Sequence, residues 1–248
     1  MVSRYFIRLG YDGARYHGWQ IQPNGLSVQE VLQQSLSVLL RTPTPITGAG
    51  RTDSGVNARL MVAHFDFDGP LDWHQLAYRL NRMVPQDIVI RSIEPVNMAM
   101  HARFSAVSRT YHYYLHQGKE PFLSQYSMAC PYTLDFKLMN EAAQMLLGTK
   151  DFGAFCKAGT DVKTTLCTLT EAHWDSIENA FGVGQRCFTI TANRFLRNMV
   201  RAIVGTLIEV GRGRMSLEEF AKVIASGSRT AAGESVPGHA LFLWDIQY

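Results

Sequence analysis

Residues 48–58, GAGRTDSGVNA, place an arginine and an aspartate two positions apart between glycines, as Arg51 and Asp53. Three interpretations of this stretch compete. A plain turn needs only the glycines and a short polar side chain such as that of Asp53. A phosphate cradle is disfavoured, because the stretch lacks the Lys-Ser/Thr of a P-loop and the G-x-G-x-x-G of a dinucleotide turn, and a carboxylate repels phosphate. The third interpretation is a catalytic carboxylate with its counter-charge.

A strongly basic segment lies far from this stretch along the chain. Residues 186–214 contain six arginines against the single acid Glu209, an excess typical of a surface that meets phosphate. The six are Arg186, Arg194, Arg197, Arg201, Arg212 and Arg214. An unevenly charged surface without a ligand is the alternative.

Three of these arginines have helical spacing. Arg194, Arg197 and Arg201 stand at i, i+3 and i+7, at the start of a helix that the apolar pattern predicts over 194–211. Cations near a helix N-terminus oppose the macrodipole, so the stripe makes sense where an anion meets it. RNA phosphate and the Asp53 carboxylate are both candidates, and extension of the side chains into water is the alternative.

An aromatic strand is the third chemical feature. The segment SRTYHYYLH, residues 108–116, predicts a strand with Tyr111 on one face and Arg109 close by. A tyrosine face can stack on a base that has left its helix, although aromatic residues on strands more often pack in a core. An acid, a basic stripe and a stacking ring together suit chemistry on a flipped nucleobase.

The elements that must position these residues alternate between strands and helices. Strands are predicted over 4–13, 61–68, 87–96, 108–116, 164–177, 185–192 and 240–248, and helices over 27–42, 72–85, 135–148, 194–211 and 216–227. This order predicts an α+β fold with two similar α/β halves that share a continuous mixed, mainly antiparallel sheet. We expect residues 1–105 to carry the Asp53 loop, residues 106–248 to carry the Tyr111 strand and the basic helix, and a central ligand cleft to lie between the halves.

Composition excludes several other classes of protein. The 248 residues carry a net charge of +3, with 46% apolar and 18% charged residues, as in an ordinary globular protein. No apolar run is long enough to cross a bilayer, and Arg4 and Arg8 interrupt the N-terminal residues where a signal peptide needs an apolar block. The four cysteines form no C-x-x-C pair, which argues against a zinc site and a disulfide framework. We therefore expect a cytoplasmic protein without membrane contact or metal.

The stretch AGRTDSGVNA resembles the signature AGRTDAGVHA of the tRNA pseudouridine synthase A family. Four further segments carry the resemblance along the whole chain: YDGARYHGWQIQPNGLSVQEVL, HARFSAVSRTYHYYL, GTKDFGAFC and ANRFLRNMVRAIVGTLIEVG. The resemblance implies the pseudouridine synthase fold and an isomerase that converts uridines 38, 39 and 40 of the tRNA anticodon stem-loop to pseudouridine, with no cofactor and no metal. It also implies a homodimer in which both subunits contact one tRNA.

The resemblance assigns roles to individual residues. Asp53 matches the essential carboxylate, which attacks the sugar, adds to the base or abstracts a sugar proton, and which must be ionised in each case. Arg201 matches its basic partner. Tyr111 matches the tyrosine that stacks on the target uracil and is also expected to act catalytically, by assisting removal of the C5 proton. Arg51 matches the signature arginine and is expected to hold the RNA open or to occupy the space that the base vacates. The residues expected to bind tRNA are Tyr111, Arg51, Arg109, Arg194 and Arg197.

Two positions depart from the family pattern. Asn57 replaces the signature histidine, so it keeps a hydrogen bond but cannot exchange a proton near neutral pH. Cys167 stands where many members carry arginine, and without a neighbouring His or Cys it is interpreted as a packing residue. The alternative functions are a paralogue that modifies other RNA uridines and a catalytically idle RNA-binding module, which Asn57 alone favours. A glycoside hydrolase is disfavoured because no second carboxylate partners Asp53.

Overall fold

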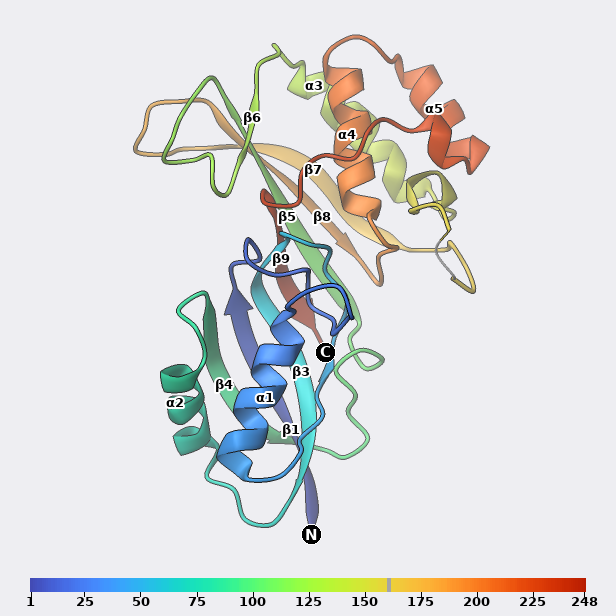
Figure 1. Cartoon of the computed structure of the whole chain (residues 1–248). Coiled ribbons are helices and arrows are strands. Elements are labelled where there is room, and N and C mark those ends of the chain that lie inside the picture. Colours follow the sequence, from blue (N-terminus) through green and yellow to red (C-terminus); the bar gives the residue numbers. More distant parts are fainter. Residues whose placement is uncertain (160–161) are drawn as a thin grey trace. The chain divides into compact units, whose positions relative to one another are not determined.

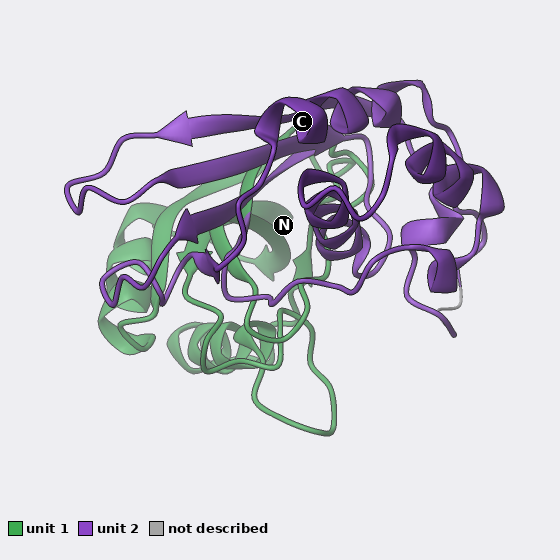
Figure 2. Ribbon diagram, turned by 90° about the horizontal axis from the view of Figure 1, so that it is seen from above, with its two compact units in different colours: residues 1–107, 243–248 green, residues 108–242 purple. Residues whose placement is uncertain are grey.

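The computed structural model of the chain describes residues 1–159 and 162–248. The chain divides into two compact units, unit 1 with residues 1–107 and 243–248 and unit 2 with residues 108–242 (Figure 2). The chain passes from unit 1 to unit 2 after residue 107, and residues 243–248 belong to unit 1.

Unit 1 consists of strands with two helices beside them. Its elements are β1 (Val2–Tyr11), α1 (Val28–Leu40), β2 (Thr47–Gly48), β3 (Asn57–Asp68), α2 (Trp73–Met83) and β4 (Ile88–Val96). β1 pairs antiparallel with both β3 and β4. The hydroxyl of Ser27 accepts the Glu30 amide at 3.2 Å and so fixes the start of α1. α1 lies over β1 and β3 (Figure 1), and its apolar stripe is buried at Val28, Leu32 and Leu36.

Unit 2 repeats the combination of antiparallel strands and packed helices. Its elements are β5 (Ser108–Gln117), β6 (Met128–Cys130), α3 (Phe136–Met145), β7 (Leu169–Ile177), β8 (Gln185–Ala192), α4 (Met199–Gly211) and α5 (Leu217–Ser226). Short 3-10 turns cover Leu146–Gly148, Gly153–Phe155 and Arg229–Ala231. β8 pairs antiparallel with both β5 and β7, and α3 contacts both α4 and β7. α5 begins with the predicted capping box of Ser216 and Glu219.

The strands of the described chain form one large, open and mainly antiparallel sheet. Its order is β4-β1-β3-β9-β5-β8-β7, with β2 beside β3 and β6 beside β5. The last strand, β9 (Leu241–Gln247), starts in unit 2 and ends in unit 1. The short pair of β5 and β6 is parallel, which makes the sheet a mixed one. The α+β fold class and the mixed, mainly antiparallel sheet predicted from the sequence are confirmed.

The helix predicted over 194–211 begins later than expected. α4 starts at Met199, because its N-cap Asn198 has a left-handed backbone with φ of 65° and does not continue a helix toward the N-terminus. The side-chain Nδ2 of Asn198 donates to the hydroxyl of Ser235 at 2.6 Å, which stabilises this conformation. Arg194 and Arg197 therefore lie before α4, in the connection from β8. The prediction of a three-arginine stripe on one helix is wrong, since only Arg201 is on the helix.

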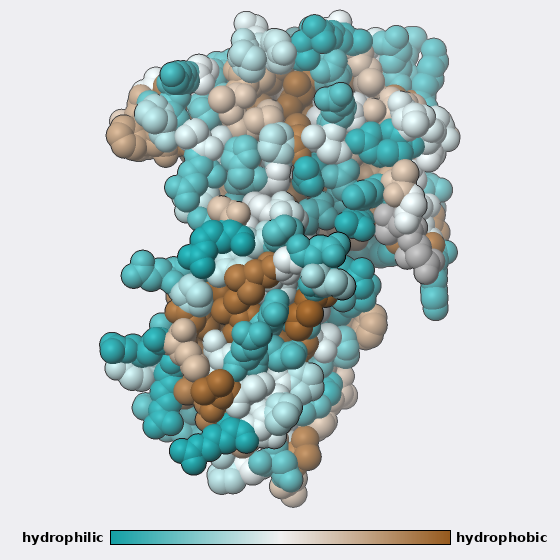
Figure 3. All heavy atoms as spheres, viewed as in Figure 1, coloured by the Kyte–Doolittle hydropathy of each residue, from teal (hydrophilic) through white to brown (hydrophobic). Residues whose placement is uncertain are grey.

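The surface of unit 1 around α1 mixes hydrophobic and hydrophilic residues (Figure 3). Val38, on the outer side of α1, is 61% exposed, whereas Leu36 two residues earlier is fully buried. Such amphipathic helices cover a sheet on one side and meet water on the other. Within the described residues, no helix combines the length and the apolar character that a membrane span requires.

Candidate active site

The Asp53 loop is a tight turn held by main-chain atoms. The carbonyl of Asp53 accepts the amide of Val56 at 3.2 Å, and Gly55 has φ of +73°, the left-handed conformation that glycine adopts easily at the third position of such a turn. The Asp53 side chain is half-buried and Arg51, earlier in the loop, is exposed. The turn and the catalytic carboxylate are thus compatible interpretations, because the turn leaves the carboxylate to other contacts.

A second segment, residues 11–19, supports this turn from the chain between β1 and α1; we call it the supporting segment. The carbonyl of Tyr16 accepts the Gly55 amide at 3.2 Å and the Ser54 hydroxyl at 3.4 Å. The hydroxyls of Tyr11 and Thr52 are hydrogen-bonded at 2.9 Å. The loop is therefore fixed on both sides of Asp53 by residues that precede it by about 40 positions.

Two glycines of the supporting segment allow this close approach. A Cβ atom on Gly18 would lie 2.2 Å from the carbonyl oxygen of Thr52, and one on Gly13 would lie 2.2 Å from that of Val56. Gly18 also has φ of +90°, which disfavours any other residue. Sequence reasoning assigned no site role to these glycines. Their spacing in YDGARYHGW was a usable signal, because paired glycines often mark a close approach of two backbones.

Asn57 supports the loop from its other end. Its side chain is 1% exposed, and its Oδ1 accepts the amide of Gly13 at 2.8 Å. A buried backbone amide needs such an acceptor, and no proton is exchanged in supplying one. Asn57 therefore has a structural role here, and its presence in place of the signature histidine no longer favours a catalytically idle protein.

Gly55→Ala is expected to lower the free energy of unfolding by about 1–2 kcal/mol, because the left-handed backbone conformation is less favourable for alanine than for glycine by that amount. Nothing lies within 4 Å of a Cβ at this position, so the penalty comes from the backbone alone. Gly50→Ala is the matched control in the same loop, since Gly50 also has open space but no positive φ. Urea denaturation measures both variants, and equal midpoints would contradict the prediction.

Tyr111 stands on β5 opposite Ile190 of β8. Its ring is half-buried and meets the ring of Phe195 edge to face, with centroids 5.0 Å apart. Tyr113, the next residue on the same face, is fully buried. Phe195 thus holds the Tyr111 ring at the border between core and solvent, which is where a stacking residue must lie.

The predicted arginines of unit 2 differ in their surroundings. Arg109 donates to the carbonyl of Asn193 at 2.8 Å, so β5 and the β8–α4 connection bring it, Tyr111 and Phe195 into one region. Arg201, in the first turn of α4, donates through Nε to the carbonyl of Val236 at 2.7 Å. Arg194 makes a long hydrogen bond of 3.4 Å to the carbonyl of Thr164. The side chain of Arg197 is exposed.

Comparison with known proteins agrees with this combination of loop, strand and arginines. The family model described as tRNA pseudouridine synthase matches residues 9–105 and 142–248. The chain belongs to the tRNA pseudouridine synthase family. It is 53% identical to tRNA pseudouridine synthase A of Bacteroides fragilis over all of this chain and 97% of that protein. It is 39% identical to the protein of the same name from Bacillus subtilis, over 97% of each chain.

Cys167 has the packing role predicted for it in this member of the synthase family. Its side chain is 4% exposed, and burial raises the pKa of the thiol to about 11. A thiol with that pKa is protonated at neutral pH and is a poor nucleophile. In residues 1–159 and 162–248, no group of three or more His, Cys, Asp or Glu side chains is arranged to hold a metal ion.

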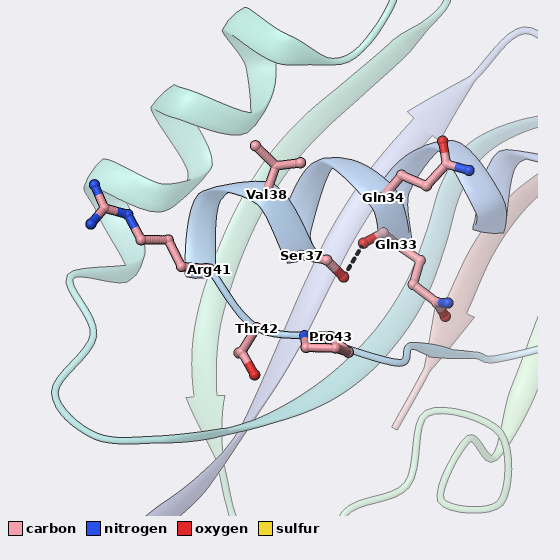
Figure 4. Close-up of a pocket in the computed structure, with 7 residues that line it drawn as sticks. All are labelled: Gln33, Gln34, Ser37, Val38, Arg41, Thr42 and Pro43. Carbon is pink, nitrogen blue, oxygen red and sulfur yellow. Dashed lines mark hydrogen bonds between the residues drawn. The ribbon is translucent and has the colours of Figure 1, made fainter.

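A hollow of about 400 Å³ lies at the C-terminal end of α1 (Figure 4). Its lining residues are Gln33, Gln34, Ser37, Val38, Arg41, Thr42 and Pro43, none of which is a predicted site residue. The Ser37 hydroxyl donates to the Gln33 carbonyl and accepts the Thr44 amide, and the Gln33 side chain accepts the Ile46 amide. These polar groups hold the turn after α1 in place.

Proposed function

We propose that this synthase isomerises uridines 38, 39 and 40 of the tRNA anticodon stem-loop, with Asp53 as its essential carboxylate. Family membership supports tRNA pseudouridine formation by an isomerase. The observation that carries the assignment to Asp53 is its turn: the backbone is fixed from two directions, while the carboxylate stays half-exposed. A rigid support with an accessible side chain is what a catalytic group requires.

The reaction is a rearrangement and needs no external electron or group donor. The N1–C1′ glycosidic bond breaks, the uracil turns, C5 bonds to C1′, C5 loses its proton, and N1 ends with a proton. Asp53 acts ionised, by attack on the sugar, by addition to the base or by abstraction of a sugar proton. Each route is compatible with a carboxylate that a turn holds through its main chain.

The other roles follow the same proposal. Tyr111 stacks on the target uracil, and Arg201 is the basic partner that keeps the essential carboxylate ionised. Arg51, Arg109, Arg194 and Arg197 bind tRNA, with Arg51 holding the opened RNA. The protein acts in the cytoplasm as a homodimer, both subunits contacting one tRNA, and it uses neither metal nor cofactor.

Tritium release from tRNA labelled at uracil C5 tests the reaction directly, because formation of the C5–C1′ bond expels that hydrogen. Release is expected with the purified protein and unmodified tRNA. It should disappear when uridines 38–40 are replaced by cytidine. Release that survives the replacement would move the target to other uridines, and no release despite tRNA binding would indicate an idle RNA-binding module.

Tyr111→Phe keeps the ring and removes the hydroxyl, so tRNA affinity should stay within about threefold of wild type. Tyr111→Ala should weaken binding of the anticodon stem-loop by about 1–3 kcal/mol, the range for loss of one base–aromatic stack. Filter binding and single-turnover tritium release measure both variants. Equal affinity of the alanine and phenylalanine variants would exclude stacking.

Arg197→Ala should weaken tRNA binding uniformly across tRNA sequences, because its exposed side chain is assigned to a phosphate contact. The slope of log Kd against log salt concentration should fall by about 1, the amount expected for one lost phosphate contact. Arg82→Ala is the control, since Arg82 is an exposed arginine in the last turn of α2. Kd is measured from 50 to 300 mM salt. A slope unchanged by Arg197→Ala would place this residue outside the RNA footprint.

A further inference from the structure

We propose that Asn57 is a positioning residue for Asp53, acting through the supporting segment; the inference rests on the proposed function. Asn57 does not act on the substrate. It holds the Gly13–Tyr16 part of the supporting segment, which in turn holds the Asp53–Val56 turn. The orientation of the Asp53 carboxylate thus depends on one buried hydrogen-bond acceptor four residues away.

The contacts form a closed ring of main-chain and side-chain groups. The Oδ1 atom of Asn57 accepts the Gly13 amide at 2.8 Å, and the Gly13 carbonyl accepts the Tyr16 amide at 2.9 Å. The Tyr16 carbonyl accepts the amide of Gly55 at 3.2 Å, inside the turn that Asp53 begins. The chain itself closes the ring from Gly55 to Asn57. Loss of one link therefore loosens the whole turn.

The ring is anchored to the rest of unit 1 at Asp87. The Tyr16 hydroxyl donates to Oδ1 of Asp87 at 2.6 Å, and the Asp12 amide donates to the carbonyl of the same residue at 2.9 Å. Tyr16 is 1% exposed, and burial raises the pKa of its phenol above the usual range. The hydroxyl is thus a permanent donor at working pH. The anchor fixes the supporting segment against the residues just before β4.

In this ring Asn57 serves as a hydrogen-bond acceptor. The Asn57 side chain is buried and its Oδ1 faces a backbone amide, so proton exchange has no part in it. A neutral imidazole can also accept a hydrogen bond through a ring nitrogen. Asn57→His is therefore expected to keep the ring intact, whereas Asn57→Ala leaves a buried amide of Gly13 without a partner.

The test compares Asn57→Ala, Asn57→His and a control, Asn81→Ala, by single-turnover tritium release and tRNA binding. The Asn81 side chain also bridges main-chain groups, but it does so between α2 and β4. Its Oδ1 accepts the Ile90 amide at 2.8 Å, and its Nδ2 donates to the Ile90 carbonyl at 2.7 Å. Asn57→Ala should lower kcat about 10–100-fold, as expected for a catalytic group displaced by up to about 1 Å, with Kd for tRNA within threefold. Asn57→His should recover kcat to within about threefold of wild type.

Two results would overturn the inference while wild-type activity remains intact. These are an Asn57→Ala kcat no lower than that of Asn81→Ala, and an Asn57→His kcat, measured above about pH 7.5 where a histidine is neutral, as low as that of Asn57→Ala. If Asn57→Ala does not fold, Tyr16→Phe tests the anchor, and unchanged kcat there would also overturn it. An inactive wild type would instead refute the proposed function.

Discussion

Asp53→Asn is expected to lower kcat for pseudouridine formation by about a thousandfold or more, while Kd for tRNA stays within about threefold. The amide has nearly the shape of the carboxylate but carries no charge and is neither a nucleophile nor a base. The turn should survive, because its hydrogen bond uses the main-chain carbonyl of Asp53 and the amide of Val56. The loss then belongs to the chemical step.

Single-turnover tritium release with saturating enzyme measures that step, and filter binding measures Kd. Asp68→Asn is the matched control, since the Asp68 carboxylate is 71% exposed at the end of β3 and pairs with the N-terminus. The control should retain wild-type kcat and Kd. A rate for Asp53→Asn above about a tenth of wild type, or a melting temperature several degrees lower, would contradict the assignment of Asp53.

The elements of the fold were largely predictable, because their signals are local. The apolar stripe that buries Leu32 and Leu36 marks α1, and the Ser216–Glu219 pair marks the start of α5. The start of α4 was not predictable in this way. Asn198 adopts a left-handed backbone, and its side-chain Nδ2 donates to the hydroxyl of Ser235, a residue far along the chain. A tertiary contact therefore overrides the helical pattern before Met199.

The candidate site was predictable in its chemistry but not in its support. Arg51, Asp53 and Gly55 identify a polar turn in the sequence itself. The residues that hold this turn, such as Gly13 and Tyr16, precede it by about 40 positions, and no spacing rule connects them. The function of Asn57 was undecided for the same reason, since its partner is the backbone amide of Gly13.

A second large effect is expected at Gly205, inside α4. A Cβ atom there would lie 1.7 Å from the carbonyl oxygen of Glu234. The contact is with backbone, so no side chain can rotate away, and the segment 233–236 must move. Hydrogen bonds connect α4 with that segment: the Thr206 hydroxyl accepts the Gly233 amide at 3.0 Å, and Arg201 donates to the carbonyl of Val236. Separation of α4 from this segment therefore disturbs Arg201 as well.

Gly205→Ala should destabilise the protein by about 2–3 kcal/mol, since overpacking outweighs the roughly 1 kcal/mol of helix propensity that alanine adds. The melting temperature should fall by about 4–12 °C for a chain of this size. kcat should also fall at temperatures where the variant is folded, because the carbonyl that Arg201 bonds is displaced. Gly148→Ala is the control, as nothing lies within 4 Å of its Cβ and its φ is not positive. A Gly205→Ala melting temperature within 1 °C of this control would show that segment 233–236 does not pack against α4.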